Sequence, residues 1–154
     1  MGPFPDGVYR AQFPYYYRNS EGMPQEAALD YYLNSIKDVF EQCGPADSIA
    51  AIVVQPLQGE GGFIPAPIEW VKAVRKICDE NGILLVADEV QTGFCRTGRM
   101  FATQYWEEAG VQPDILATAK SIAAALKTIE IMERDDLAGR SCEIGEKVSK
   151  RFNE

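Results

Sequence analysis

The sequence predicts an α/β fold, a mostly parallel sheet with flanking helices, followed by a C-terminal helical tail. The first observation is an apolar run at residues 83–87 that ends in two carboxylates, a pattern typical of a buried parallel strand. The second is a helical pattern over residues 67–81, which lies between this run and an earlier apolar run at 49–54. Strand, helix and strand in this order predict one βαβ unit.

The composition is that of a globular protein. A chain of 154 residues is long enough for one domain with a sizeable core. Its 46% apolar and 25% charged residues are ordinary proportions, and its net charge of −8 argues against a nucleic-acid partner. No apolar run is as long as a membrane span, and the amino terminus has no signal-peptide pattern, so we expect no membrane partner.

The cysteine pattern and the lack of histidine exclude several kinds of site. The four cysteines are widely and irregularly spaced, without a Cys-x-x-Cys pair: Cys43, Cys78, Cys95 and Cys142. Scattered thiols fit a reducing compartment better than a disulfide framework, so we expect a cytoplasmic protein. Without histidine we expect no metal site, and a Ser-His-Asp or Cys-His mechanism is excluded within this chain.

The amino-terminal part predicts an irregular segment and a helix. Residues 1–23 are rich in Pro, Gly and Tyr, and we expect their aromatic side chains to pack onto the domain. Pro24 suits the first turn of a helix, which ends near Cys43. An apolar stripe at helical spacing predicts the core face of this helix: Leu29, Tyr32, Leu33, Ile36 and Phe40.

A loop and a second helix follow the strand at 49–54. Proline and glycines predict that residues 55–62 lie outside regular structure, and Ile64 stands where a dinucleotide-binding loop would need its last glycine. The helix at 67–81 has its apolar side facing the core and closes at Gly82.

The rest of the chain predicts one more strand and the helical tail. A glycine-bounded loop at 94–99 and a helix at 101–109 precede a short strand at 114–118. If the strands are parallel, the last of them delivers Lys120 to the sheet edge where Asp88 lies. Residues 123–154 have a helical pattern, broken near Asp135, Asp136 and Gly139.

Asp88 is the candidate functional residue, because ligands of open α/β sheets bind beyond the carboxyl ends of the strands. One interpretation is a phosphate hydrolase, in which Asp88 holds magnesium and Glu89 orients water. That mechanism needs a phosphate-binding loop, and the closest match, Gly93 to Gly98, continues with Arg99 instead of the required lysine. The hydrolase is therefore disfavoured.

The other interpretation pairs Asp88 with Lys120. A lysine shielded from water can form a Schiff base with an aldehyde, because desolvation lowers its pKa. Pyridoxal phosphate is such an aldehyde, and its chemistry requires a carboxylate on the pyridine nitrogen. The protonated ring nitrogen would also offset the cost of holding Asp88 at the end of an apolar strand.

Three motifs occur in an order that resembles the class III (ω-amino acid) aminotransferases, most closely the 4-aminobutyrate aminotransferases. They are Ile49 to Phe63, with its Gln-Pro-Leu-Gln-Gly-Glu-Gly-Gly core; Ala87-Asp88-Glu89-Val90-Gln91-Thr92-Gly93 with Arg96-Thr97-Gly98; and Pro113 to Leu116 with Ala119-Lys120-Ser121. The resemblance implies part of a fold-type I large domain over residues 1–123. It also implies that residues 124–154 are a helical tail resembling the segment that leads to the C-terminal domain.

The resemblance also implies roles for individual residues. Lys120 would be the Schiff-base lysine and proton shuttle, Asp88 would bind the pyridine nitrogen, and Val90 would pack on the ring. Gln91 would hydrogen-bond the ring hydroxyl, and Glu60 matches a glutamate that gates the substrate site. The implied reaction is amino transfer from an ω-amino acid such as 4-aminobutyrate to a 2-oxo acid such as 2-oxoglutarate, in a homodimer with pyridoxal phosphate.

The chain departs from the family pattern at several points. Gln55 stands where glutamate is usual, and Cys95 where glycine is common. The resemblance also implies that the amino-terminal half of the family pattern is missing and that a segment is deleted after Ala123. These departures leave an alternative open: a non-catalytic product of a degenerate gene that associates with full-length subunits.

Overall fold

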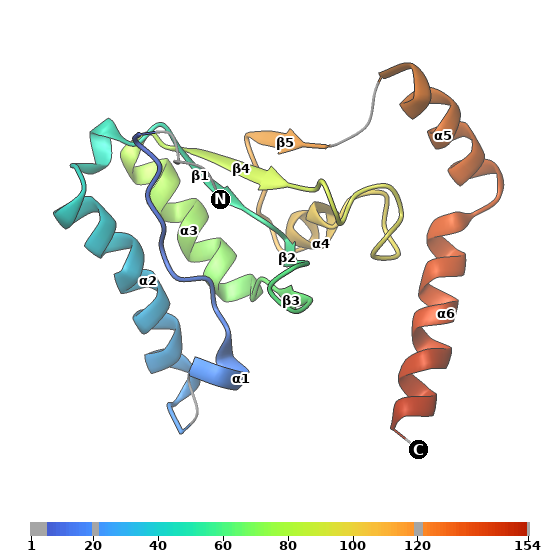
Figure 1. Ribbon diagram of the computed structural model, residues 1–154, viewed down its shortest axis with the longest axis horizontal. Coiled ribbons are helices and arrows are strands. Elements are labelled where there is room, and N and C mark those ends of the chain that lie inside the picture. Colours follow the sequence, from blue (N-terminus) through green and yellow to red (C-terminus); the bar gives the residue numbers. More distant parts are fainter. Residues whose placement is uncertain (1–5, 20–21, 119–121, 154) are drawn as a thin grey trace. The chain divides into compact units, whose positions relative to one another are not determined.

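The computed structural model describes residues 6–19, 22–118 and 122–153 (Figure 1). The described chain contains helices, strands and one 3-10 turn. In chain order they are α1 (Tyr16–Asn19), α2 (Gln25–Gln42), η1 (Ala46–Ser48), β1 (Ala51–Val54), β2 (Leu57–Gln58), β3 (Ile64–Pro65), α3 (Ile68–Asn81), β4 (Leu84–Asp88), α4 (Thr103–Glu108), β5 (Ile115–Ala117), α5 (Ile122–Arg134) and α6 (Leu137–Phe152). The predicted alternation of strands and helices is confirmed.

The strands form two sheets. The larger has the order β1-β4-β5, and the smaller pairs β2 with β3. β4 and β5 are parallel, with Val86 opposite Ile115 and Asp88 opposite Ala117, and Figure 1 shows their arrows pointing the same way. The sequence predicted that β5 ends beside Asp88 if the strands are parallel, and they are parallel.

The residues group into two compact units, and each is described by itself. The first comprises Met1–Ile52 and Ala66–Leu84, and the helices α2 and α3 pack against each other within it. Its buried side chains include Tyr32 and Ile36 from α2 and Trp70 and Val74 from α3. The apolar stripes read from helical spacing are therefore core faces.

Both long helices of the first unit begin after a proline, as their sequences predict. A proline just before the first turn is tolerated because the first N–H groups of a helix have no internal acceptor. α3 ends at Gly82, whose φ of 66° places it in the left-handed region that favours glycine. The predicted start and stop of this helix are thus confirmed.

The amino-terminal aromatic segment packs onto the first unit. The Phe13 ring meets Trp70 edge-on, with ring centroids 5.5 Å apart, and Tyr16 lies against Tyr32 at 5.7 Å. The segment contains one short helix, α1, that the sequence did not predict. Burial of aromatic area explains why this proline-rich stretch is held to the surface of the helices.

The second unit comprises Val53–Pro65 and Leu85–Glu154. Asp114 joins β5 to β4 there: its carboxylate oxygen Oδ2 accepts from the Leu85 N–H at 2.7 Å, and its own N–H donates to the Leu85 carbonyl at 2.8 Å. These two reciprocal hydrogen bonds fix the register immediately before β5 begins. The predicted strand at 114–118 is observed as Ile115–Ala117.

The expectation that residues 55–62 lie wholly outside regular structure is wrong. Leu57 and Gln58 pair antiparallel with Pro65 and Ile64, so the loop is a small hairpin. Its turn closes through the Gly62 N–H, which donates to the Gly59 carbonyl at 3.0 Å. Pro65 is compatible with this ladder because the ladder is only two residues long and both its strands are edge strands.

The tail consists of two helices, as predicted. α5 ends at Arg134 and α6 begins at Leu137, with the break at Asp135 and Asp136. Asp136 has a φ of 43°, and its side chain caps α6 by accepting from the Gly139 N–H at 3.2 Å. The predicted helix at 101–109 is shorter, because helical hydrogen bonding begins only at Thr103. None of the helices in the described residues combines the length and apolar character needed to cross a membrane.

Candidate functional site

Asp88 is the last residue of β4 and lies at the carboxyl end of the parallel β4–β5 pair. Its side chain is half-buried, and Oδ1 accepts from the Val90 N–H at 3.0 Å. In the parts of the chain that the structure describes, Oδ2 accepts no hydrogen bond. A half-buried carboxylate with one oxygen left over can accept a proton donor from a ligand at the edge of the sheet.

Val90 and Gln91 follow Asp88 in a turn and are both exposed. Val90 shows 52% of its surface to solvent. Gln91 lies against the backbone of Gly59, so close that a Cβ added at Gly59 would overlap its carboxamide. A side chain at position 59 would therefore displace the Gln91 carboxamide.

The hairpin β2–β3 brings Glu60 to the neighbourhood of Gln91, because Glu60 directly follows Gly59. Its side chain is exposed. Among the described residues Glu60 has no ion-pair partner. The structure thus brings together two sequence-predicted site residues, Gln91 and Glu60, from segments about 30 residues apart in the chain.

Lys120, the predicted amine, lies outside the described residues. The structure describes the strand that precedes it: β5 ends at Ala117, opposite Asp88. Since the two strands are parallel, the chain leaves β5 at the edge of the sheet where Asp88 lies. The pairing of Asp88 with Lys120 stays a prediction.

Glu89 does not have the solvent access that the hydrolase interpretation needs. Its side chain is 0% exposed. Oε2 accepts from the Thr92 hydroxyl at 2.5 Å and from the Ala102 N–H at 3.0 Å, and Oε1 accepts from the Thr103 N–H at 2.6 Å. A carboxylate occupied in this way cannot orient water. In addition, the described residues contain no group of three or more potential metal-ligating side chains.

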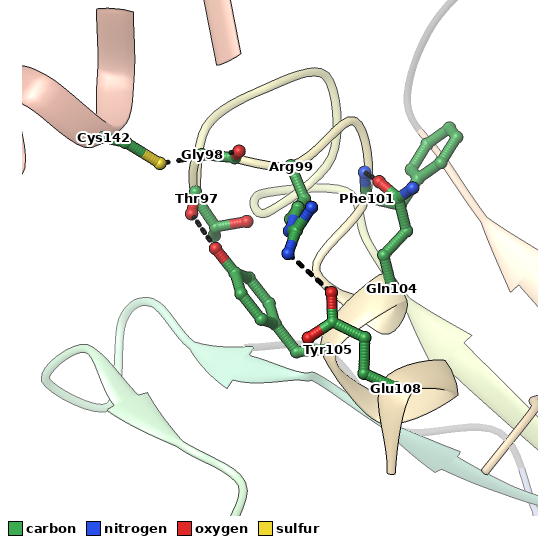
Figure 2. A network of polar contacts seen from close by, with 8 residues as sticks. All are labelled: Thr97, Gly98, Arg99, Phe101, Gln104, Tyr105, Glu108 and Cys142. Carbon is green, nitrogen blue, oxygen red and sulfur yellow. Dashed lines mark hydrogen bonds and ion pairs between the residues drawn. The ribbon is translucent and has the colours of Figure 1, made fainter. Parts of the chain in front are cut away.

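The loop after the turn is tied to α4 by the contacts drawn in Figure 2. The Tyr105 hydroxyl donates to the Thr97 carbonyl at 2.8 Å, and Arg99 pairs with Glu108 at 2.5 Å. The ion pair is solvent-exposed on both sides, so it contributes little to stability. Two neighbouring residues in this loop, Phe94 and Cys95, have φ values of 58° and 64°.

Cys95 is the buried thiol of this loop, with 6% of its surface exposed. Burial raises the pKa of the Cys95 thiol, and the nearby Asp136 carboxylate raises that pKa further. Both causes disfavour the thiolate, so Cys95 is not set up as a nucleophile. Its positive φ agrees with the glycine that is common at this position in the resembling family.

Sequence reasoning missed the two contacts that shape the site. The hydrogen bonds that Glu89 accepts from the N–H groups of residues 102 and 103 join positions 13 and 14 apart, and no local pattern marks such a pair. The close approach of Gln91 to Gly59 was also missed, because no local pattern distinguishes Gly59 from Gly61 and Gly62 in the same loop. Three glycines in a four-residue stretch were the only available signal.

The comparisons with known proteins agree on one family. The model of the aminotransferase class-III family matches residues 1–152. A probable 4-aminobutyrate aminotransferase of Bacillus subtilis is 40% identical over 137 residues, which are 89% of this chain and 31% of that relative. The 5-aminovalerate aminotransferase DavT of Pseudomonas putida is 36% identical over an alignment of 189 positions, with 100% of this chain and 42% of that relative.

Two further facts follow from these matches. The chain spans less than half of the length of either relative. The alignment with the Pseudomonas putida enzyme has 189 positions for 154 residues, so the difference of 35 positions has no counterpart within this chain.

A solved structure supports the same assignment. An amine transaminase from an uncultivated Pseudomonas species, in the PLP-bound form, is 30% identical with a TM-score of 0.73, over 88% of this chain and 39% of that chain. The α/β fold of the described residues is thus that of a part of a transaminase. The chain belongs to the class-III aminotransferases.

Proposed function

We propose that this chain carries the ring-binding part of a pyridoxal phosphate site and serves amino transfer. The donor would be an ω-amino acid such as 4-aminobutyrate, and the acceptor a 2-oxo acid such as 2-oxoglutarate. The proposal rests on the family and on one observation: the parallel register that sets the end of β5, three residues before Lys120, opposite Asp88.

The described residues fit the ring of this cofactor. Asp88 Oδ2 would share a proton with the ring nitrogen, since among the described residues only Oδ1 accepts a hydrogen bond. Exposed Val90 would cover the ring face, and the Gln91 carboxamide would donate to the ring hydroxyl. When bound, pyridoxal phosphate supplies an electron-accepting ring and an aldehyde.

Two other residues would act on the substrate. Lys120 would supply the amine that bonds to the aldehyde, and it would move the Cα proton of the substrate. Glu60, exposed on the hairpin next to Gly59, would gate the substrate site. We further propose a division at residues 1–123 and 124–154, a homodimeric working enzyme, and a cytoplasmic location, the last supported by four free cysteines.

The test is reductive trapping. The purified chain is incubated with pyridoxal phosphate, treated with borohydride, digested and mapped by mass spectrometry. We expect one cofactor adduct on Lys120, absent from Lys120→Ala and retained in Lys127→Ala, a matched change at an exposed lysine that pairs with Glu130. An adduct spread evenly over surface lysines, in a folded protein, would refute the site.

A second assay separates the cofactor site from turnover. Formation of glutamate from 4-aminobutyrate and 2-oxoglutarate is measured for the wild-type chain, with Lys120→Ala and Lys127→Ala as controls. Glutamate formation that Lys120→Ala abolishes would support the full proposal. Trapping on Lys120 without turnover would restrict the proposal to cofactor binding.

A second candidate function is association with full-length aminotransferase subunits without catalysis. The observation that favours it is the exposure of apolar strand residues: Val53 at 66%, Ile115 at 47% and Leu116 at 37%. Strands of parallel sheets are normally covered on both faces. Light scattering after gel filtration tests this candidate, since a stable monomer that does not co-elute with a full-length class III subunit would exclude it.

A further inference from the structure

The turn that faces the proposed cofactor contains one residue that points away from it. Asp88 is half-buried, and Val90 and Gln91 are exposed, whereas Glu89 between them is 0% exposed. Burying a carboxylate is costly unless hydrogen bonds compensate for it. Glu89 has three such bonds, from the Thr92 hydroxyl and from the Ala102 and Thr103 N–H groups.

The backbone of Glu89 is held as firmly as its side chain. Its N–H donates to the Ala117 carbonyl at the end of β5, at 2.9 Å. Its carbonyl accepts from the Gly93 N–H, also at 2.9 Å, which closes the turn. One residue therefore joins three segments: the end of β5, the turn at 88–93, and the start of α4.

The neighbours of Glu89 depend on this anchoring. Asp88 and Val90 are bonded covalently to it, and the Val90 N–H donates to Asp88 Oδ1. That hydrogen bond sets the orientation of the Asp88 carboxylate and leaves Oδ2 available for a ligand. If Glu89 moved, the Val90 N–H and the Asp88 carboxylate would lose their relative position.

We propose that Glu89 is a positioning residue, which holds the turn in the shape that aims Asp88 at the ring nitrogen of the cofactor. This inference deepens the proposed function and rests on it. The side-chain chemistry explains why glutamate is needed. Both carboxylate oxygens accept from N–H groups, so glutamine would place its own NH₂ group against a backbone donor. Aspartate is shorter by one methylene and would not reach both.

The first experiment needs no cofactor. Amide hydrogen exchange is measured on the wild-type chain and on Glu89→Gln, with Glu107→Gln as the control at an exposed glutamate of α4. We expect Glu89→Gln to speed exchange at Ala102 or Thr103, since one of these two N–H groups loses its acceptor, and also at Val90. The exchange rate at Val90 should rise at least tenfold, because its hydrogen bond depends on the shape of the turn.

The Val90 amide is the deciding readout. Faster exchange confined to Ala102 and Thr103, with Val90 unchanged, would overturn the proposal, since Glu89 would then only cap α4. Because this result is obtained without pyridoxal phosphate, it stands even if the wild-type chain binds no cofactor and the proposed function fails.

The second experiment uses bound pyridoxal phosphate and the pH dependence of its absorbance. In Glu89→Gln the misplaced Asp88 should hold the proton on the ring nitrogen less well. The midpoint pH of the absorbance change that reports loss of this ring-nitrogen proton should therefore fall by at least one unit. Partial unfolding would lower the amount of bound cofactor but would leave this midpoint unchanged. An unchanged midpoint in a variant that still binds cofactor would also overturn the proposal.

Thr92 offers a graded and conservative control. Thr92→Val removes the hydroxyl that donates to Glu89 but keeps the side-chain shape, whereas Thr92→Ser keeps the hydroxyl. We expect Thr92→Val to shift Val90 exchange and the absorbance midpoint in the same direction as Glu89→Gln, by a smaller amount, and Thr92→Ser to restore both. A serine variant that behaves like the valine variant would contradict the role of this hydrogen bond.

Discussion

The backbone conformation at Cys95 can be tested by the sign of a difference in stability between two variants. Its φ is 64°, in the left-handed region, and the side chain is buried. Cys95→Ala and Cys95→Gly both remove the thiol, so the packing of sulfur cancels between them. The two variants differ by one Cβ, and at this φ a Cβ costs about 1–2 kcal/mol.

The expected difference can be worked out from two opposing effects. Glycine relieves the backbone strain but loses about 0.5–1 kcal/mol through the greater freedom of the unfolded chain. The net result is that Cys95→Gly should be more stable than Cys95→Ala, by roughly 0.5–1 kcal/mol. At an ordinary helical position the order is reversed, with alanine more stable than glycine by about 1 kcal/mol.

The measurement is urea unfolding followed by tryptophan fluorescence. The chain has two tryptophans, and Trp106 is buried in the unit that contains Cys95. A Trp70→Phe background therefore confines the signal to that unit. The control pair is Glu107→Ala and Glu107→Gly, at an exposed position of α4, where the alanine variant should have the higher free energy of unfolding.

The free energies of unfolding are comparable only if the urea dependence is the same in all four variants. If Cys95→Ala were at least as stable as Cys95→Gly, with the control pair in its ordinary order, the left-handed conformation at Cys95 would be refuted.

Three further outcomes are expected. Gly59→Ala should displace the Gln91 carboxamide and weaken cofactor trapping on Lys120 about tenfold or more. Little stability should be lost, because Gln91 is exposed and its side chain can rotate. Unchanged trapping would contradict the close approach of Gln91 to Gly59. In α6, Gly145→Ala meets open space and should stabilise the helix by about 0.5–1 kcal/mol, whereas Gly139→Ala overlaps the capping Asp136 side chain and should lack this gain, as local hydrogen exchange would report. Finally, the folded state holds the Cys95 proton more tightly than the unfolded state, because the pKa of the thiol is raised in the folded state. The contribution of this thiol to stability is fully present below pH 9.0, its ordinary pKa, and is lost as the pH rises through the higher folded value. Urea titrations from pH 8 to 10 should show a decline in the free energy of unfolding that Cys95→Ala reduces.

The long elements could be predicted from the sequence because periodicity and end signals agree in them. The stripe containing Tyr32 and Ile36, and the stop at Gly82, are local patterns. Strand β4 was equally clear, since an apolar run ends at a carboxylate. The hairpin β2–β3 escaped because its ladder is two residues long and Pro65 lies in it, so no alternation could develop.

The candidate site was only partly predictable for a related physical reason. Asp88 could be found because a strand end is a local feature of the chain. The buried hydrogen bonds of Glu89 and the close approach of Gln91 to Gly59 arise only when distant segments meet. The same pair of adjacent carboxylates therefore suggested magnesium chemistry, while the fold uses one of them as an internal anchor.

The two reciprocal hydrogen bonds between Leu85 and Asp114 have a consequence at the opposite end of their strands. If β5 slipped by one residue along β4, everything after it would shift by about 3.3 Å and its side chains would turn to the other face of the sheet. Asp114 excludes that slip. The register that sets Ala117 opposite Asp88 is thus fixed before β5 begins, by a residue at the far end of the strand pair.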